Sequence, residues 1–370
     1  MTFILPDYNP PDFNQQFFKD APVVVFKPVK QAGIAPDNYH ATSVYPEYFK
    51  VKKKVWRLIE ESRMDCVVVQ TPTGKLSVTE CRKLKTGDLV ACGREENGKD
   101  GILVHVNAFN FSDYKAEKFA FRSHLTRETS FSIDYDELYD LLEYDRVNGF
   151  ILWVLGPAVV FDHDSRKAFT GLIEKGFVHG LLAGNALATH DLEGALFGTA
   201  LGQKLYSKRS AELGHYKHLD ALNIIRKTGS IKAAIQEGRI KDGVMRALIE
   251  NQIPYVLAGS IRDDGPMPEV IGDAYRAQDK MRRLTRRATT VIALSTQLHA
   301  IAAGNMTPSY KVEGKNMVRP VFFYTVDMSE FAISKLADRG SLTARSILTN
   351  VQDFVVNVER SLLKSHKGAP

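Results

Sequence analysis

Three short apolar runs in this chain each end in a cluster of small or polar residues. The runs and their clusters occupy residues 181–186, 255–266 and 291–299. Unbroken apolar runs of this length are typical of strands that are buried on both faces of a parallel sheet. In open α/β sheets, ligands bind beyond the carboxyl ends of such strands, where glycine lets the backbone approach the ligand. Each cluster alone could be an ordinary turn, but three clusters that can line one crevice favour a binding site.

From Gly149 onward, strand patterns alternate with helical patterns, which predicts an α/β fold with a parallel sheet. Before that point, short β-type runs alternate with turns, which predicts a small β-rich domain. The predicted strands of the α/β part cover 150–155, 178–183, 254–258, 290–294 and 321–326, and the predicted helices cover 165–175, 216–227, 230–237, 243–251, 271–286, 297–304, 329–338 and 351–364.

We divide the chain into an arm (1–40), a small β-rich domain (41–111), a helical connector (112–148) and a carboxy-terminal α/β domain (149–370). The arm is polar and irregular, yet it carries several phenylalanines and valines that are too apolar for a free tail. It can dock on a neighbouring subunit, where it would help to close a pocket, or fold back on its own small domain. We expect the protein to be a homo-oligomer, either a dimer or a tetramer.

Composition is that of an ordinary globular protein, with 44% hydrophobic and 25% charged residues. No stretch approaches the roughly 18–20 apolar residues that span a bilayer, and the amino terminus lacks the features of a signal peptide. Cys66, Cys81 and Cys92 are odd in number and lack metal-ligand spacing, which predicts reduced thiols in a cytoplasmic protein without a metal site. The basic stretch 276–287 could contact nucleic acid, but it is more typical of a solvated helix face. We therefore predict neither a nucleic-acid partner nor a membrane.

The segment 290–327 has the layout of half a nucleotide-binding fold: a strand, a polar turn, a helix and a second strand that ends at Asp327. A carboxylate at that position can accept both hydroxyl hydrogens of an adenosine ribose, and it would repel the extra phosphate of NADP. Helix amides that open near Thr296 could hold a pyrophosphate. The turn, however, lacks the glycine fingerprint G-x-G-x-x-G, and Asp327 could equally be an ordinary residue at a helix N-terminus.

Several longer motifs resemble the archaeal-type ornithine cyclodeaminase family, whose module also forms the carboxy-terminal part of cyanobacterial arginine dihydrolase/ornithine cyclodeaminase enzymes. The motif Leu257-Ala258-Gly259-Ser260-Ile261-Arg262-Asp263-Asp264-Gly265-Pro266 is the most specific of them. The others are 156–160, 182–188, 190–193 and 304–309, with 64–66 and 85–90 matching in the small domain. The resemblance covers roughly residues 40–365.

This resemblance implies a deoxyhypusine-synthase-like Rossmann domain that binds NAD and converts L-ornithine to L-proline and ammonia by internal hydride transfer. It implies NAD contacts by the residues Asn185, Ala186, Asp264, Thr296, Gln297, Leu298, His299, Asp327, Asn350 and Val351. The Thr296 turn and Asp327 are thus indicated twice, once by the residues alone and once by the family. At Asn350 the family usually has aspartate, so this chain keeps the acceptor and loses the charge.

The chain departs from the family pattern in three places. Only the arm 1–40 stands where family members commonly carry a further amino-terminal region. Residues 161–165 differ from the usual His and Thr-Gly, and an inserted segment covers about 311–320. The missing amino-terminal region and the altered residues 161–165 leave open an NAD-binding regulatory or partner subunit without activity of its own. A further alternative is an amino-acid or imine dehydrogenase, in which the hydride is not returned.

Candidate catalytic residues lie beside the predicted cofactor contacts. His190 can move protons near pH 7, although a packed or capping histidine is the more common case. Arg262 can clamp a substrate carboxylate through paired N–H donors, or it can pair with a neighbouring aspartate. Asp263 and Asp264 are adjacent, so if both face the crevice, one of them can hold a proton. The predicted substrate is a small amino acid, ornithine or a similar compound.

Overall fold

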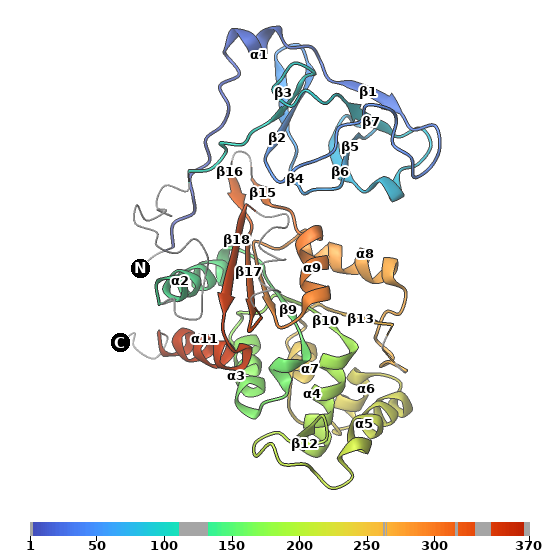
Figure 1. Cartoon of the computed structure of the whole chain (residues 1–370), viewed down its shortest axis with the longest axis vertical. Helices are drawn as coiled ribbons and strands as arrows, with labels where there is room; N and C mark the ends of the chain where they lie inside the picture. Colours follow the sequence, from blue (N-terminus) through green and yellow to red (C-terminus); the bar gives the residue numbers. More distant parts are fainter. Residues whose placement is uncertain are drawn as a thin grey trace.

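The computed structural model describes residues 3–110, 132–261, 263, 265–314, 317–329 and 342–365. Antiparallel strands occupy one end of the molecule, and a sheet flanked by helices occupies the rest (Figure 1). Most of the predicted helix 329–338 and residues 112–131 of the predicted connector lie outside the described residues. Within those described ranges, no helix is both long and apolar enough to cross a membrane.

The central sheet has six parallel strands. Their spatial order is β13 (Tyr255–Ala258), β10 (Gly180–Gly184), β9 (Ile151–Leu155), β14 (Thr290–Leu294), β17 (Phe322–Asp327) and β18 (Thr343–Leu348). Numbered along the chain, this is the order 3-2-1-4-5-6 of the doubly wound dinucleotide-binding fold. The predicted Rossmann-like sheet is confirmed. Strand β18 was not predicted from the sequence, because only its last two residues are buried and it has no apolar run.

Helices cover both faces of this sheet, and alternate residues of each strand face opposite layers. In β9, Trp153 is buried in the layer formed with α2, α3 and α11, whereas Leu152 and Val154 are buried against α8 and α9. Trp153 is fully buried, and its indole N–H donates to the carbonyl of Phe177 at 2.9 Å. The bounds of these helices are α2 (Ser132–Asn148), α3 (His163–Glu174), α8 (Ala274–Thr285), α9 (Gln297–Met306) and α11 (Val351–Ser365).

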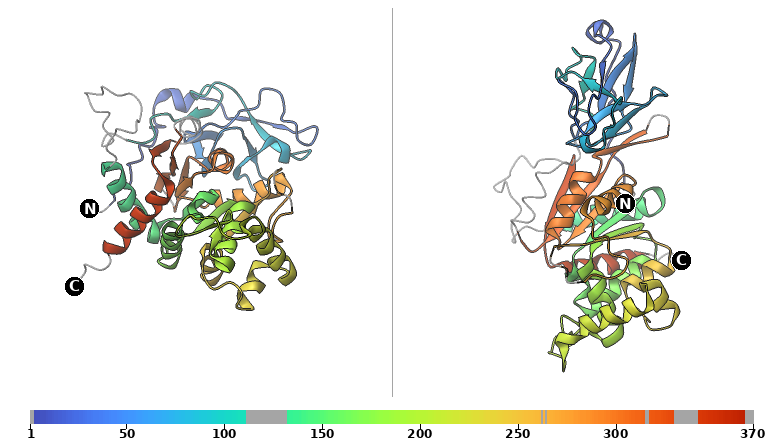
Figure 2. Two further views of the ribbon diagram at one scale, coloured as in Figure 1. Left: turned by 60° about the horizontal axis from the view of Figure 1, so that its bottom comes forward. Right: turned by 90° about the vertical axis from the view of Figure 1, so that its right-hand side faces the viewer.

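Between β10 and β13 the chain forms a mainly helical region at the end of the molecule opposite the antiparallel sheets (Figures 1 and 2). It comprises α4 (Asn185–Phe197), β11 (Thr199–Ala200), β12 (Gln203–Lys204), α5 (Gly214–Thr228), α6 (Ile231–Gln236) and α7 (Val244–Glu250). Helix α4 was not predicted from the sequence. Eight of its first ten residues are buried, so it lacks the one-sided apolar pattern that identifies a surface helix.

The amino-terminal part is β-rich, as predicted. One antiparallel sheet has the order β1 (Val25–Pro28), β7 (Leu89–Cys92), β5 (Val67–Gln70), β6 (Leu76–Thr79), and a second has the order β3 (Val55–Leu58), β2 (Glu47–Lys52), β8 (Ile102–Val104). Strand β1 belongs to the predicted arm, which packs on its own chain. The short helix α1 (Gln16–Asp20) is held there by the buried ammonium of Lys50, which donates to the carbonyls of Phe18, Lys19 and Ala21 at 2.5–3.0 Å.

The predicted inserted segment 311–320 is a β-hairpin that joins the two parts of the chain. Its strands are β15 (Tyr310–Glu313) and β16 (Met317–Pro320), and β15 pairs with β4 (Glu61–Ser62). Tyr310 is fully buried among small-domain residues and donates to the carbonyl of Ile59 at 3.0 Å. Arg319 donates through two nitrogens to the buried carboxylate of Asp145, at 2.9 and 3.1 Å. The hairpin therefore belongs to both cores.

Basic residues in the last turn of α8 and directly after it add charged contacts to the same junction. Arg282 is buried and pairs with Glu80 of the small domain, and Arg286 pairs with Glu61. Asp279 on α8 accepts from Arg82 and Lys83 at 2.7 Å each. The basic stretch 276–287 is thus only partly a solvated helix face, because two of its arginines hold the small domain.

Candidate functional site

A cleft of about 360 Å³ lies at the carboxyl ends of β9, β10, β13 and β14. Its walls come from the segments 155–157, 184–187 and 295–299, together with Ser260 and Asp263. Strands β9 and β14 are neighbours in the sheet, but the chain leaves them in opposite directions, toward β10 and toward β17. This is the topological switch point at which open α/β sheets bind ligands. The three clusters that the sequence analysis selected therefore meet in one cleft.

The first wall is the start of α4. Gly184 precedes the helix, and no side chain caps the helix N-terminus in the described structure. Asn185 is buried, and its Oδ1 accepts from the backbone N–H of Met267 at 3.1 Å. This bond holds the loop after β13 against the helix. Ala186, a predicted NAD contact, lines the cleft beside it.

The second wall is the start of α9. Thr296 has extended backbone geometry, and no side chain caps the helix N-terminus within the described residues. Thr296, Gln297, Leu298 and His299 all line the cleft. Ser295 before them has a φ of +47°, a region that costs energy for any residue except glycine. Such local strain often accompanies a functional turn.

Two glycines allow these walls to approach each other. A Cβ at Gly156 would collide with the carbonyl oxygen of Ser295, so the turns after β9 and β14 meet only because this residue lacks a side chain. A Cβ at Gly184 would lie 2.8 Å from Cε1 of His299. The His299 ring therefore lies against the start of α4 and spans the cleft between its two helix ends.

His299 is the titratable ring of the cleft. It is half-buried, and its Nδ1 lies 3.5 Å from the hydroxyl of Thr296. Burial lowers the pKa of His299, and the nearby carboxylate of Asp263 partly opposes that effect. Oδ2 of Asp263 accepts from the backbone N–H of Ser260 at 2.8 Å, which fixes the carboxylate at the cleft. A neutral imidazole beside a carboxylate can accept a proton near pH 7.

Three further predicted cofactor contacts, Asp327, Asn350 and Val351, lie at the carboxyl ends of the next two strands, β17 and β18. Asp327 ends β17, and its Oδ1 accepts from the backbone N–H of Ser329 at 2.9 Å. Asn350 precedes α11, and its Oδ1 accepts from the N–H of Gln352 at 2.8 Å. Asn350 thus already acts as a helix cap. Val351, the first residue of α11, is buried.

His190 lies further along α4 and is not among the residues that line the cleft. Its Nδ1 lies 2.8 Å from Oε2 of Glu193, and its ring packs edge-on against Phe161. Burial would raise the pKa of Glu193, but bonds from His190, the N–H of Gly202 and the hydroxyl of Thr199 outweigh it and lower that pKa. Two further predicted catalytic residues, Arg262 and Asp264, lie outside the described residues.

Sequence reasoning missed the parts of the site that depend on distant contacts. The bond between Asn185 and Met267 and the contact between Gly156 and Ser295 join residues far apart in the chain, and no local pattern signals them. The sequence 156–157, Gly-Pro directly after an apolar run, was a usable signal for the turn after β9.

The arrangement fits a dinucleotide. The uncapped amino ends of α4 and α9, helices of 13 and 10 residues, open on one cleft. Helix N-termini offer free N–H groups and a positive dipole end, which suit a pyrophosphate. Asp327 lies one strand further along the same edge, where a ribose can be bound.

Comparison with known proteins places this fold and cleft in context. Residues 137–358 match the family model described as "Arginine dihydrolase ArgZ-like, C-terminal, Rossmann fold". An ornithine cyclodeaminase of Methanocaldococcus jannaschii is 38% identical over 355 residues, which cover 93% of this chain and 79% of that protein.

Two solved structures share the fold. The crystal structure of a conserved putative LOR/SDH protein from Methanococcus maripaludis S2 matches with a TM-score of 0.83 and 34% identity, covering 93% of this chain and 99% of the other. The ternary complex of AgrE with ornithine and NAD⁺ matches with a TM-score of 0.59 and 31% identity, covering 95% of this chain and 47% of AgrE.

Proposed function

The chain belongs to the ArgZ-like carboxy-terminal Rossmann family that includes the archaeal ornithine cyclodeaminases, and we propose that it converts L-ornithine to L-proline and ammonia. The cofactor is NAD, as the Rossmann fold and the complex of AgrE with NAD⁺ support. The observation that carries the proposal is the meeting of two uncapped helix N-termini and Asp263 in the cleft at the switch point.

In this proposal the amino ends of α4 and α9 bind the pyrophosphate of NAD, and Asp327 binds the adenosine ribose. Asn185 keeps the start of α4 in place through its bond to Met267. When bound, NAD would supply the hydride acceptor and the hydride donor for the Cα of the substrate. The protein must therefore hold the amino acid beside the cofactor and move protons.

Proton transfer is assigned to His299. The δ-ammonium group of ornithine must lose a proton before its nitrogen can attack, and a neutral imidazole can take that proton. Burial lowers the pKa of His299 and so favours the neutral form. Asp263, fixed in the cleft by the N–H of Ser260, can attract the positively charged amine.

We also propose roles for three predicted residues that are not among the described residues lining the cleft. We propose that Arg262 binds the substrate carboxylate and that Asp264 contacts the cofactor, since both flank Asp263 in the sequence. For His190 we propose a positioning role, because it bonds to Glu193, whose carboxylate also accepts from the hydroxyl of Thr199 and the N–H of Gly202.

Incubation of the purified protein with NAD and L-ornithine tests the proposed reaction. Proline and ammonia in equal amounts, without net NADH, would support cyclodeamination. Accumulating NADH would show instead a dehydrogenase, and the absence of any turnover would favour an NAD-binding regulatory or partner subunit. Parallel assays of His299→Asn and His190→Asn separate the two histidines, because only the first is expected to lose most of the activity while it still binds NAD.

Asp327 is tested by calorimetry with NAD and NADP. We expect Asp327→Asn to weaken NAD binding by about tenfold or more, since a hydrogen bond to a charged group contributes roughly 1.5–3 kcal/mol. Asp353→Asn is the matched control, because it removes an exposed carboxylate at the start of α11. Tighter binding of NADP than of NAD by the unaltered protein would contradict the ribose assignment.

A further inference from the structure

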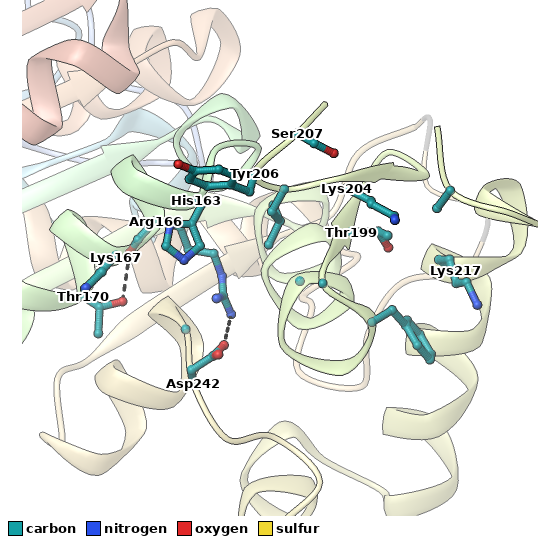
Figure 3. A pocket seen from close by; sticks show the side chains of 16 residues that line it. His163, Arg166, Lys167, Thr170, Thr199, Lys204, Tyr206, Ser207, Lys217 and Asp242 are labelled. Atoms are coloured by element: carbon teal, nitrogen blue, oxygen red, sulfur yellow. Dashed lines mark hydrogen bonds and ion pairs between the residues drawn. The ribbon is translucent and has the colours of Figure 1, made fainter. Parts of the chain in front are cut away.

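Helix α5 contacts different parts of the molecule with its two ends. Near its amino end, Lys217 lines a cavity of about 850 Å³ that lies beside α3 and α4 (Figure 3). Figure 3 shows Lys167 and Lys217 on opposite sides of this cavity, and Arg166 is already paired there with Asp242. These charges do not converge on one ligand. At the carboxyl end of α5, Arg226 reaches the loop that follows β13.

The loop after β13 carries Ser260 and Asp263 to the cleft at the switch point. The backbone N–H of Asp263 donates to the carbonyl of Ser260 at 3.0 Å, and Oδ2 of Asp263 accepts from the N–H of Ser260 at 2.8 Å. Both bonds are internal to the loop, so they fix the carboxylate within the loop but do not fix the loop within the protein. The buried Met267 supplies one anchor, because its N–H donates to Oδ1 of Asn185 at 3.1 Å.

Arg226 supplies a second anchor, which is nearer to Asp263 in the sequence. Its Nη2 donates to the carbonyl of Pro266 at 3.2 Å. Gly265 has a φ of +83°, and a Cβ at this position would collide with Nη2 of Arg226. The guanidinium therefore lies directly against the backbone of the Gly265–Pro266 segment, and only glycine suits both the backbone conformation and the contact. Arg226 is exposed, so this bond is not part of the hydrophobic core.

The position of Asp263 depends on this anchor. Asp263 lies three positions before Pro266, so its carboxylate moves if the Gly265–Pro266 segment is released. An exposed cation in the last turn of a helix also has a general role, because it stabilises the carboxyl end of the helix. Lys227 lies in the same turn of α5, so it shares this general role but not the bond to Pro266. The two roles can therefore be separated by experiment.

We propose that Arg226 is a positioning residue of the cleft: it holds the Gly265–Pro266 segment against α5 and thereby keeps the carboxylate of Asp263 beside His299 and the amine of the substrate. Arg226 itself is not among the described residues that line the cleft, so it acts through the loop. Its effect on turnover rests on the proposed function, in which Asp263 attracts the amine and His299 accepts its proton. The placement of Asp263 beside His299 can be measured without NAD or ornithine.

The test follows the titration of the His299 imidazole by NMR, with His299→Asn to assign its signal. Asp263→Asn removes the carboxylate that opposes the effect of burial, so the pKa of His299 should fall. Arg226→Ala should lower this pKa by at least about half as much, because the carboxylate moves away from the ring. Loss of the Arg226 charge alone would act in the opposite direction, since removing a cation favours protonation of a nearby imidazole. Lys227→Ala is the matched control, because it removes the neighbouring exposed cation and keeps the bond to Pro266.

Kinetics of the same variants test the effect on turnover. At saturating NAD, we expect Arg226→Ala to lower kcat/KM for ornithine about tenfold, because a misplacement of roughly 1 Å can cost up to about 100-fold in rate. Lys227→Ala should leave kcat/KM unchanged. If the unaltered protein does not turn over ornithine, the proposed function fails, while the titration still decides whether Arg226 places Asp263. A pKa of His299 that is unchanged or raised in Arg226→Ala would overturn the proposal, and so would a lowered pKa with unchanged kcat/KM.

Discussion

Replacing Glu80 with glutamine removes a negative charge that two arginines share at the junction of the small domain and α8. Oε1 of Glu80 contacts both Arg63 and Arg282, and the three side chains are 14%, 10% and 7% exposed. Lys83 lies 3.5 Å from the other carboxylate oxygen. Burial would raise the pKa of Glu80, but Arg282 and Arg63 outweigh it and lower that pKa. The carboxylate is therefore held in its charged form.

The cost of this substitution follows from the burial of the three groups. Removing one partner of a buried ion pair costs about 3–5 kcal/mol, because the remaining charge stays buried without compensation. Glutamine keeps the size of the side chain and one acceptor oxygen, so we expect Glu80→Gln to lower the free energy of unfolding by about 3 kcal/mol, the lower end of that range. Glu60→Gln is the matched control. Oε2 of Glu60 lies 2.8 Å from Nζ of Lys75, but the side chains of Glu60 and Lys75 are 64% and 59% exposed. Exposed ion pairs of this kind contribute about 0–1 kcal/mol to stability.

Guanidinium denaturation at pH 7 measures both variants. The difference between Glu80→Gln and the unaltered protein should be fully present above the ordinary glutamate pKa of about 4.3. This difference in stability should disappear as the pH falls through the lowered pKa that Glu80 has in the folded protein. Protonation of Glu80 then removes from the unaltered protein the same negative charge that the substitution removes. A loss below 1 kcal/mol at pH 7, or an equal loss in Glu60→Gln, would refute the reasoning.

Two further predictions concern the cleft. Gly184→Ala places a Cβ 2.8 Å from Cε1 of His299, so the start of α4 must move away from the cleft. Because the N–H groups at the start of α4 are proposed to bind the pyrophosphate, we expect NAD affinity to fall about tenfold or more. Gly304→Ala is the control, since its Cβ would meet its nearest neighbour at 3.8 Å, and it should leave NAD affinity unchanged. Equal affinities in a fluorescence titration would contradict the contact. Burial lowers the pKa of His299, so this ring binds a proton more readily in the unfolded chain than in the folded protein. The free energy of unfolding should therefore decrease as the pH falls below about 6.5, the ordinary pKa of histidine. The variant His299→Gln should show a smaller decrease in thermal midpoint between pH 7 and pH 5.5, and an unchanged slope would speak against a buried neutral ring.

Most of the central sheet was predictable because its strands are apolar on both faces. Five strands of the parallel sheet lie within two residues of their predicted starts. The sixth, β18, is an edge strand with the sequence Thr-Ala-Arg-Ser-Ile-Leu, which offers little apolar surface to a periodicity argument. Helix α4 was missed for the opposite reason, because it is buried on several sides and its residues show no polar face.

The site divides in the same way between local and distant information. The turn at Thr296 and Asp327 follow from a strand–turn–helix–strand pattern that is continuous in the sequence. Asn185 lies in the first of the three clusters chosen from the residues alone, but its assignment as a cofactor contact, like that of Asn350, came only from the family resemblance. The close approach of Gly156 to Ser295 depends on the order of strands in the sheet, which sequence patterns do not give.

The small domain and the cleft lie at opposite edges of the sheet. Strand β15 pairs with the small domain and belongs to the hairpin that directly precedes β17. The carboxyl end of α8, which also contacts the small domain, directly precedes β14. Both contacts with the small domain are therefore at the amino ends of the parallel strands. The cleft is at the carboxyl ends, and none of its described lining residues comes from residues 3–110. Stability at the junction and cofactor binding should therefore be separable. We expect Glu80→Gln, measured well below its unfolding transition, to bind NAD with the affinity of the unaltered protein. A tenfold weaker affinity would show that the small domain contributes to the shape of the cleft through the sheet.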